Sequence, residues 1–310
     1  MTDAKSRLGE LALIDRICAS TRGTKVTGVR VGIGDDCAVL RVPRGHEMVV
    51  TTDFSLEGKH FRRDWHSAES VGHRCLARGL SDIAAMGAKP LGAFLSLALP
   101  QQYDLRWVDD FVAGFTGLAK RWRVELAGGD TAQAPGEEIL ADVLVTGTVR
   151  AGRALLRTRA GVGDRIYVTG RLGAAAVELE GMMASAPVGR GRQRFPEPRV
   201  GVGLALVRRR MATACMDLSD GLSTDLGHLA RASGVGAELT GLPLYDDATL
   251  EQGLHGGEDY ELLFTATRET RVPKRIAGVE VTCVGEIVAG AGVRMDGVAV
   301  EPGGWAHFRE

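Results

Sequence analysis

The sequence lacks several features that would identify a class of protein at once. Only 5% of its 310 residues are aromatic, and its five cysteines are far apart, with no Cys-x-x-Cys pair. An odd number of scattered cysteines argues against a disulfide framework or a zinc site, so we expect reduced thiols. No stretch approaches the roughly 18 apolar residues of a membrane-spanning helix, and the first residues lack the apolar segment of a signal peptide. We therefore expect a cytoplasmic protein.

An excess of charge of one sign is also missing. The chain has 38 Lys and Arg against 39 Asp and Glu, a formal net charge of −1. This balance argues against a general electrostatic affinity for nucleic acid or for a membrane surface, which needs clustered Lys and Arg. At roughly 100–200 residues per domain, the length predicts two domains.

The common nucleotide-binding loops are absent as well. There is no Gly-x-x-x-x-Gly-Lys-Ser/Thr loop, no complete Gly-x-Gly-x-x-Gly fingerprint, and neither the His-Arg-Asp nor the Asp-Phe-Gly motif of protein kinases. A nucleotide would have to be held differently, for example by carboxylates and metal ions. Arg153, Arg157 and Arg159 are suited to phosphate oxygens, although exposed loop arginines are more often solvated.

Helices and strands are predicted to alternate in both halves of the chain. Apolar residues spaced by three and four over 105–122 predict an amphipathic helix capped by Asp104. Further helices are predicted over 11–19, 68–86 (capped by Ser67), 172–183, 201–211 and 222–232. Strands are predicted over 38–42, 47–52, 91–99, 124–127, 139–149, 165–169, 260–266, 279–287 and 293–300. One more strand is predicted to end at Asp217. We therefore predict an α/β fold of the α+β type, with two domains (1–149 and 150–310) that each consist of a mixed β-sheet with packed helices.

Aspartate recurs beside Gly, Ser or Thr where the apolar segments begin or end. The five sites are Gly34-Asp35-Asp36, Thr51-Thr52-Asp53, Ser81-Asp82, Gly128-Gly129-Asp130-Thr131 and Asp217-Leu218-Ser219-Asp220-Gly221. Side chains at the ends of elements can converge on a cleft, where crowded carboxylates repel each other unless cations neutralise them. This pattern favours a hard divalent cation such as Mg²⁺ together with bound phosphates. The same compositions are typical of turns and helix caps, so that alternative stays open.

In their order along the chain, these segments resemble the thiamine-monophosphate kinase family, part of the superfamily that includes aminoimidazole ribonucleotide synthetase. The resemblance covers essentially the whole chain. It also rests on the segments Glu57-Gly58-Lys59-His60-Phe61, Leu80-Ser81-Asp82-Ile83-Ala84-Ala85-Met86-Gly87-Ala88, Gly256-Gly257-Glu258-Asp259-Tyr260-Glu261-Leu262 and Gly304-Trp305-Ala306-His307-Phe308.

The resemblance implies ATP-dependent phosphorylation of thiamine monophosphate to thiamine diphosphate, by direct in-line transfer without a covalent enzyme intermediate. It implies several Mg²⁺ ions, held by Asp36, Thr51, Thr52, Asp53, Asp82, Asp130, Asp217 and Asp220. It implies ATP contacts from Gly129, Asp130, Arg157 and Ser219, and substrate contacts from His60, Glu258 and Trp305. Residues 1–149 would bind ATP and Mg²⁺ and form a homodimer, while 150–310 would complete the substrate cleft.

General chemistry agrees with these implied roles. Both reactants are polyanions, so catalysis would consist mainly of neutralising charge and aligning donor with acceptor. Trp305 offers an aromatic face to a flat cationic heterocycle, Glu258 can accept from an aminopyrimidine, and His60 can donate to a phosphate. Taken singly, each has a simpler interpretation as a lid over the core, a turn residue or a partly buried histidine.

Other functions remain open at this point. A regulator that binds Mg²⁺ or a nucleotide without catalysis would also use the aspartates, but it would not need Glu258 and Trp305. Related ATP-dependent enzymes, such as selenophosphate synthetase or the hydrogenase-maturation dehydratase, need reactive cysteines at positions where this chain has none. The chain also departs from the family pattern at Arg78-Gly79, where Asn commonly precedes Leu-Ser-Asp, and we expect this departure to touch no ligand-binding residue. Closure over phosphates is one role open to the loop over 190–199, but the sequence assigns it no firm role.

Overall fold

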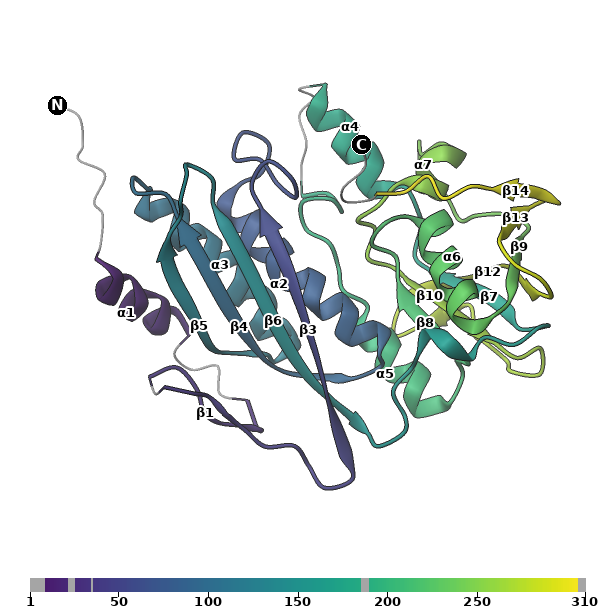
Figure 1. The fold of residues 1–310 in the computed structure, drawn as a ribbon, viewed down its shortest axis with the longest axis horizontal. Coiled ribbons are helices and arrows are strands. Elements are labelled where there is room, and N and C mark those ends of the chain that lie inside the picture. Colours follow the sequence, from purple (N-terminus) through teal and green to yellow (C-terminus); the bar gives the residue numbers. More distant parts are fainter. Residues whose placement is uncertain (1–8, 22–25, 35, 185–189, 306–310) are drawn as a thin grey trace. The chain divides into compact units, whose positions relative to one another are not determined.

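The computed structural model describes residues 9–21, 26–34, 36–184 and 190–305 (Figure 1). The chain divides into two compact units. Unit 1 comprises the residues up to 83 together with 89–151, and unit 2 comprises 84–88 together with the residues from 152 onward. The predicted boundary at 149/150 lies just before this division.

Unit 1 is built on a four-stranded mixed sheet in the order β3-β6-β4-β5. Its strands are β3 (His46–Leu56), β4 (Lys89–Leu99), β5 (Glu125–Gln133) and β6 (Leu140–Arg150), and only β4 and β5 run parallel. A short pair, β1 (Val29–Val31) with β2 (Val39–Leu40), accompanies the sheet. The helices are α1 (Glu10–Thr21), α2 (Ala68–Ala85) and α3 (Leu105–Trp122).

Helices α2 and α3 pack on the same face of this sheet (Figure 1). A Cβ added to Gly79 of α2 would meet Val145 of β6, and one added to Gly72 would overlap the backbone of Phe111 in α3, so glycines permit both close approaches. The predicted caps are confirmed: Asp104 Oδ1 accepts from the backbone of Arg106 at 2.9 Å, and Ser67 Oγ accepts from that of Ser70 at 3.2 Å.

Unit 2 contains a larger mixed sheet in the order β14-β13-β9-β12-β7-β10-β8, with β11 paired to β12. Its strands are β7 (Arg165–Thr169), β8 (Cys215–Asp217), β9 (Gly236–Leu239), β10 (Leu262–Ala266), β11 (Arg275–Ile276), β12 (Val279–Val288), β13 (Val293–Met295) and β14 (Val298–Val300). Its helical segments are η1 (Arg157–Arg159), α4 (Ala174–Met183), α5 (Val200–Arg209), α6 (Leu222–Ser233) and α7 (Leu250–His255). The buried core joins the apolar face of α6 to the strands.

The predicted fold class is confirmed, and several element bounds differ from the prediction. The strand predicted over 47–52 continues to Leu56, and the one predicted over 124–127 continues to Gln133. Asp53 and Asp130 therefore lie inside strands, and Asp82 lies inside α2, so the placement of these aspartates at the ends of elements was wrong. Pairing with the neighbouring strands extends β3 and β5 past these polar residues, and such pairing is not visible in the sequence of one strand.

The strand predicted over 293–300 is a hairpin, β13 and β14, because Asp296 and Gly297 both adopt positive φ angles (50° and 79°). Among the described residues, none of the helices has both the length and the apolar character needed to span a bilayer.

Candidate active site

In unit 1, a polar cluster lies where strand β3 faces helix α2. Asp53 Oδ1 lies 3.4 Å from Nη2 of Arg78, and Thr51 Oγ1 donates to the carboxylate of Asp82. Thr51 and Asp53 are two residues apart on β3, and Arg78 and Asp82 are four apart on α2, so each pair shares one face of its element. The structure thus brings together three of the predicted ligands and adds Arg78.

The charge of this cluster is only partly compensated. Burial raises the pKa of Asp53 to about 6, although Arg78 opposes this rise, and the negative charges of Asp82 and Asp142 reinforce it. Our expectation that the Arg78-Gly79 departure touches no ligand-binding residue is wrong, because Arg78 contacts Asp53 directly. The spacing of Arg78 and Asp82 by one helical turn is the signal that could have revealed it.

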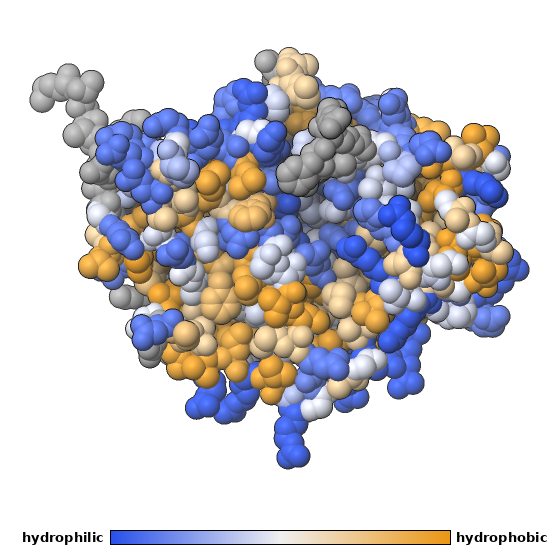
Figure 2. Space-filling model, viewed as in Figure 1, coloured by the Kyte–Doolittle hydropathy of each residue, from blue (hydrophilic) through white to orange (hydrophobic). Residues whose placement is uncertain are grey.

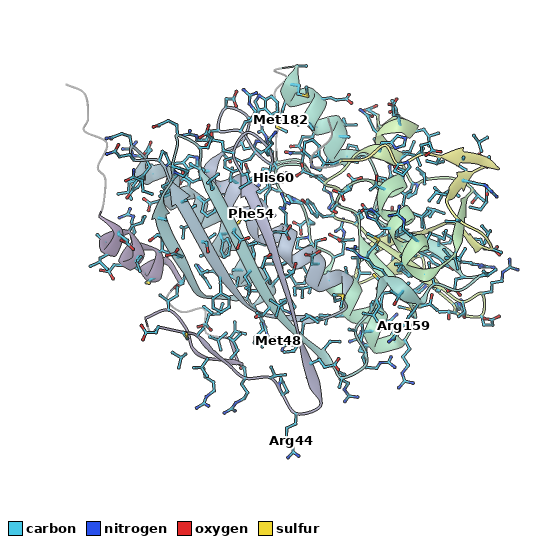
Figure 3. The ribbon with its side chains drawn as sticks, in the orientation of Figure 1. Arg44, Met48, Phe54, His60, Arg159 and Met182 are labelled. Carbon is cyan, nitrogen blue, oxygen red and sulfur yellow. The ribbon has the colours of Figure 1, made fainter. Side chains whose placement is uncertain are left out.

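Other predicted residues of unit 1 lie on the opposite, open face of the sheet. Phe54 is paired with Asp142 and is 60% exposed, whereas Asp53 is paired with the buried Val143. Ser96 is paired both with Asp142 and with Asp130, so the side chains of Asp142, Ser96 and Asp130 follow one row across the open face. Figure 3 labels Phe54 on β3.

Thr52 also lies on the open face, since it alternates with Thr51 and Asp53 along β3. Next to Asp130, the backbone of Gly129 runs so close to β4 that an added Cβ would overlap the carbonyl oxygen of Leu95. Only Gly is compatible with this approach.

His60 and Asp36 lie in turns near the sheet. His60 follows β3, and its Nδ1 accepts from the backbone N–H of Leu56 at 3.0 Å (Figure 3). Because Nδ1 accepts this bond, Nε2 is the ring nitrogen that carries a proton and can donate. Asp36 is exposed in the bend between β1 and β2, and Gly32 before it approaches Ala127 of β5. The neighbouring Asp35 lies outside the described residues.

In unit 2, three predicted ligands lie at the end of β8 and in the loop that joins it to α6. Asp217 is the buried last residue of β8, and Ser219 and Asp220 follow it. Oδ2 of Asp225 accepts the backbone N–H groups of Ser219, Asp220 and Gly221 at 3.0 to 3.1 Å. This carboxylate therefore fixes the loop, and the sequence analysis missed it.

The environment of Asp225 opposes its ionisation. Burial and the neighbouring charge of Asp220 raise the pKa of Asp225 to about 7, while the three backbone donors lower it. Ligand atoms of Asp220, Asp225 and His228 lie within 4.8 Å of one another. The position of Asp225 in the first turn of α6, where carboxylates are favoured, is the only sequence signal for its role.

The segment that contains Glu258 runs alongside this loop. The backbone N–H of Glu258 donates to the carbonyl of Ser219 at 2.8 Å, and that of Tyr260 donates to Leu218 at 2.9 Å. Glu258 and Tyr260 have positive φ angles (67° and 49°), which non-glycine residues adopt at a cost. Asp259 accepts from the backbone of Gly173 at 2.7 Å at the start of α4, and its burial raises its pKa to about 7. These contacts fix the position of Glu258.

The chain near Trp305 completes this group. The backbone N–H of Trp305 donates to the carbonyl of Asp220 at 2.9 Å, and the side chain is 51% exposed. An added Cβ at Gly304 would overlap that same carbonyl, so glycine permits the approach. Within unit 2 the structure therefore brings together Asp217, Ser219, Asp220, Glu258 and Trp305.

Arg157 is not part of this group within unit 2. Its backbone carbonyl accepts from Ser233 Oγ at 2.7 Å, and Ser233 is the last residue of α6. The Ser219 loop precedes the first residue of α6, a helix of 12 residues and therefore about 18 Å long. The side chain of Arg157 is exposed.

Comparison with known proteins shows the family of the chain. Residues 34–149 match the family model of the AIR synthase related protein N-terminal domain, and residues 161–297 match that of the C-terminal domain. The thiamine-monophosphate kinase of Salmonella typhimurium is 37% identical over 97% of this chain and 98% of its own length.

Two solved structures are similar over nearly the full length. The crystal structure of thiamine-monophosphate kinase from Stenotrophomonas maltophilia K279a has 37% identity and a TM-score of 0.81, covering 94% of this chain and 98% of that one. AaThiL complexed with AMPPCP and TMP has 31% identity and a TM-score of 0.78, covering 99% and 100%. On the strength of this identity over almost the whole sequence, the chain belongs to the thiamine-monophosphate kinase family.

Proposed function

We propose that this protein transfers the γ-phosphate of ATP to thiamine monophosphate, which forms thiamine diphosphate and ADP in the final step of thiamine diphosphate synthesis. The observation that carries the proposal is the full-length similarity to AaThiL, whose structure is complexed with AMPPCP and TMP. The terminal phosphate of the substrate attacks the γ-phosphorus while ADP leaves. Because that phosphate oxygen is already ionised near neutral pH, the reaction needs neither a covalent nucleophile nor a dedicated general base.

The donor atoms of both units fit Mg²⁺. All the predicted ligands offer oxygen, which this ion prefers, and the raised pKa of Asp53 reflects its burial and, beyond that, the neighbouring charges of Asp82 and Asp142, which a cation would offset. We propose Thr51, Asp53 and Asp82, together with Asp36, Thr52 and Asp130, as ligands from unit 1, and Asp217 and Asp220 as ligands from unit 2. Bound Mg²⁺ would neutralise phosphate oxygens and hold them in line for transfer.

The remaining polar groups would orient the nucleotide. We propose that Gly129, Asp130, Ser219 and Arg157 contact ATP. The backbone N–H of Ser219 is engaged by Asp225, so its hydroxyl is the group we assign to a phosphate oxygen. Gly129 is assigned to ATP because it lies next to Asp130 on β5. Arg157 lies at the other end of α6 from Ser219, so its exposed guanidinium would meet a different part of the nucleotide.

Three residues are assigned to the thiamine substrate. His60 would donate from Nε2 to the substrate phosphate, because Leu56 occupies its Nδ1. The half-buried carboxylate of Glu258 would accept from the amino group of the pyrimidine, and the exposed ring of Trp305 would cover a flat heterocycle.

We also propose that two copies of the chain associate through the open face of the unit 1 sheet. Figure 2 shows hydrophobic residues gathered over this part of unit 1. On β3 alone, Met48, Val50 and Phe54 are 38%, 56% and 60% exposed. These residues alternate with residues that face α2, so they lie on the open face together with Thr52, and exposed apolar side chains gathered in this way are typical of an interaction site.

A coupled assay of the purified protein tests the activity. With ATP, Mg²⁺ and thiamine monophosphate, we expect thiamine diphosphate and ADP in equal amounts, and no turnover when a chelator removes divalent cations. ADP release that does not depend on thiamine monophosphate would contradict the proposal. Mg²⁺ or nucleotide binding without any turnover would favour a regulatory protein instead.

A further inference from the structure

Gln193 connects the loop over 190–199 to the segment that carries Glu258. Its side chain is 2% exposed, and Nε2 donates to Oε2 of Glu258 at 3.0 Å. Its backbone N–H donates to Oε2 of Glu178, on α4, at 2.6 Å. A buried side chain whose backbone is held in this way has little rotational freedom left, so its amide is aimed at the carboxylate of Glu258.

The loop is also fixed at its C-terminal end. Arg199 forms two hydrogen bonds with Glu261, of which Nε to Oε2 measures 2.6 Å, and Thr169 Oγ1 donates to the same oxygen at 2.6 Å. Arg199 is 9% exposed and Glu261 is 2% exposed. Glu261 lies three residues after Glu258. The segment over 258–261 therefore contacts the loop over 190–199 twice, at Gln193 and at Arg199.

The backbone of Glu258 is fixed by Ser219, but its side chain has torsions of its own. Gln193 restrains these torsions, because its amide holds one carboxylate oxygen of Glu258 in place. Its NH₂ group can only donate, so it contacts the Glu258 carboxylate through an oxygen that acts as an acceptor. A carboxylate oriented in this way selects a ligand group that donates hydrogen bonds.

We propose that Gln193 is a positioning residue that sets substrate specificity: it holds the Glu258 carboxylate ready to accept from the exocyclic amino group of the pyrimidine. This inference rests on the proposed function, because it takes Glu258 as the residue that contacts that ring. An analogue of thiamine monophosphate with an oxo group in place of this amino group has an acceptor where Glu258 needs a donor, so the enzyme should bind it more weakly. The sequence did not single out Gln193 within this loop, since Gln193 and Glu258 are 65 residues apart.

The test compares thiamine monophosphate with its oxo analogue in steady-state kinetics. Gln193→Leu keeps the buried volume and removes the donor. We expect it to raise the KM for thiamine monophosphate about tenfold, as for loss of a hydrogen bond to a charged group, and to lower the preference over the analogue by a similar factor. The KM for ATP and the kcat should stay within about twofold of wild type. Gln102→Ala, at an exposed glutamine of unit 1, is the matched control.

A second variant separates positioning from simple packing. Gln193→Glu places two carboxylates side by side, and these share a proton at low pH but repel each other at high pH. Its KM for thiamine monophosphate should therefore rise with pH relative to wild type, whereas a packing defect would raise it equally at every pH.

Two results separate the role of Gln193 from the proposed function. If the wild type converts thiamine monophosphate but both variants keep its KM and its preference over the analogue, the role of Gln193 is wrong and the proposed function stands. If the wild type shows no transfer to thiamine monophosphate, both the proposed function and this inference are overturned.

Discussion

Replacing Asp53 by Asn should stabilise the metal-free protein at neutral pH. The folded-state pKa of Asp53 is raised to about 6, while an unfolded chain has an Asp pKa of about 4. A raised pKa means that the contribution of Asp53 to stability is fully present below about pH 4 and is lost as the pH rises to about 6. Asn cannot ionise, so the variant avoids this loss.

The size of the effect follows from the two pKa values. A difference of about two units, at about 1.4 kcal/mol each, corresponds to about 3 kcal/mol at neutral pH. The carboxylate is 23% exposed and its contact with Arg78 is lost in the variant, so we expect a gain of about 1–3 kcal/mol. Roughly half of the full gain should be reached near pH 5, and very little should remain near pH 4.

Urea unfolding in the presence of a chelator measures this gain. The free energies of unfolding of wild type and Asp53→Asn would be compared at pH 4.5 and pH 7.5, with Asp110→Asn, at an exposed carboxylate on α3, as the control. Saturating Mg²⁺ should stabilise the wild type more than the variant and so reduce the gain, because a ligand stabilises only the state that binds it. A variant less stable than wild type at pH 7.5 without Mg²⁺, or a gain independent of pH, would refute the reasoning.

Three further predictions concern the other unit, the nucleotide site and the open face. Asp130→Asn and Asp220→Asn should each lower turnover far more than they lower the thermal midpoint, and a variant with near-normal turnover at saturating Mg²⁺ would exclude that residue as a ligand. Arg199→Met should destabilise the protein by about 3–5 kcal/mol in urea unfolding, because it removes the buried arginine from Glu261 and leaves only the longer contact with Arg192 at 3.9 Å, whereas Arg199→Met with Glu261→Met should cost much less. Phe54→Lys should convert a dimer to a monomer in analytical ultracentrifugation, and an unchanged mass would place the interface elsewhere.

Much of the fold follows from local patterns in the sequence. The helix predicted over 105–122 has those same bounds in the structure, and Asp104 caps it. A helix period and a cap act within a few residues, so one short stretch of sequence contains the whole signal. Strand β5 shows the limit of such local patterns. The strand predicted over 124–127 continues to Gln133 through the glycines at 128 and 129. Pairing with β4 sustains that extension, and pairing is not visible in the strand itself.

The sequence predicted which residues belong to the candidate site, but it did not predict how they are arranged in space. The sequence alone identified the aspartates and the family, because the motifs are contiguous and occur in a fixed order. It could not show that Asp53 lies on the face of β3 that α2 covers, place Arg78 beside Asp53, or join Gln193 to Glu258. Those relations depend on strand register and on contacts between residues far apart along the chain. Local residue types determine which chemical groups are present, whereas long-range packing decides which groups meet and which charges remain uncompensated.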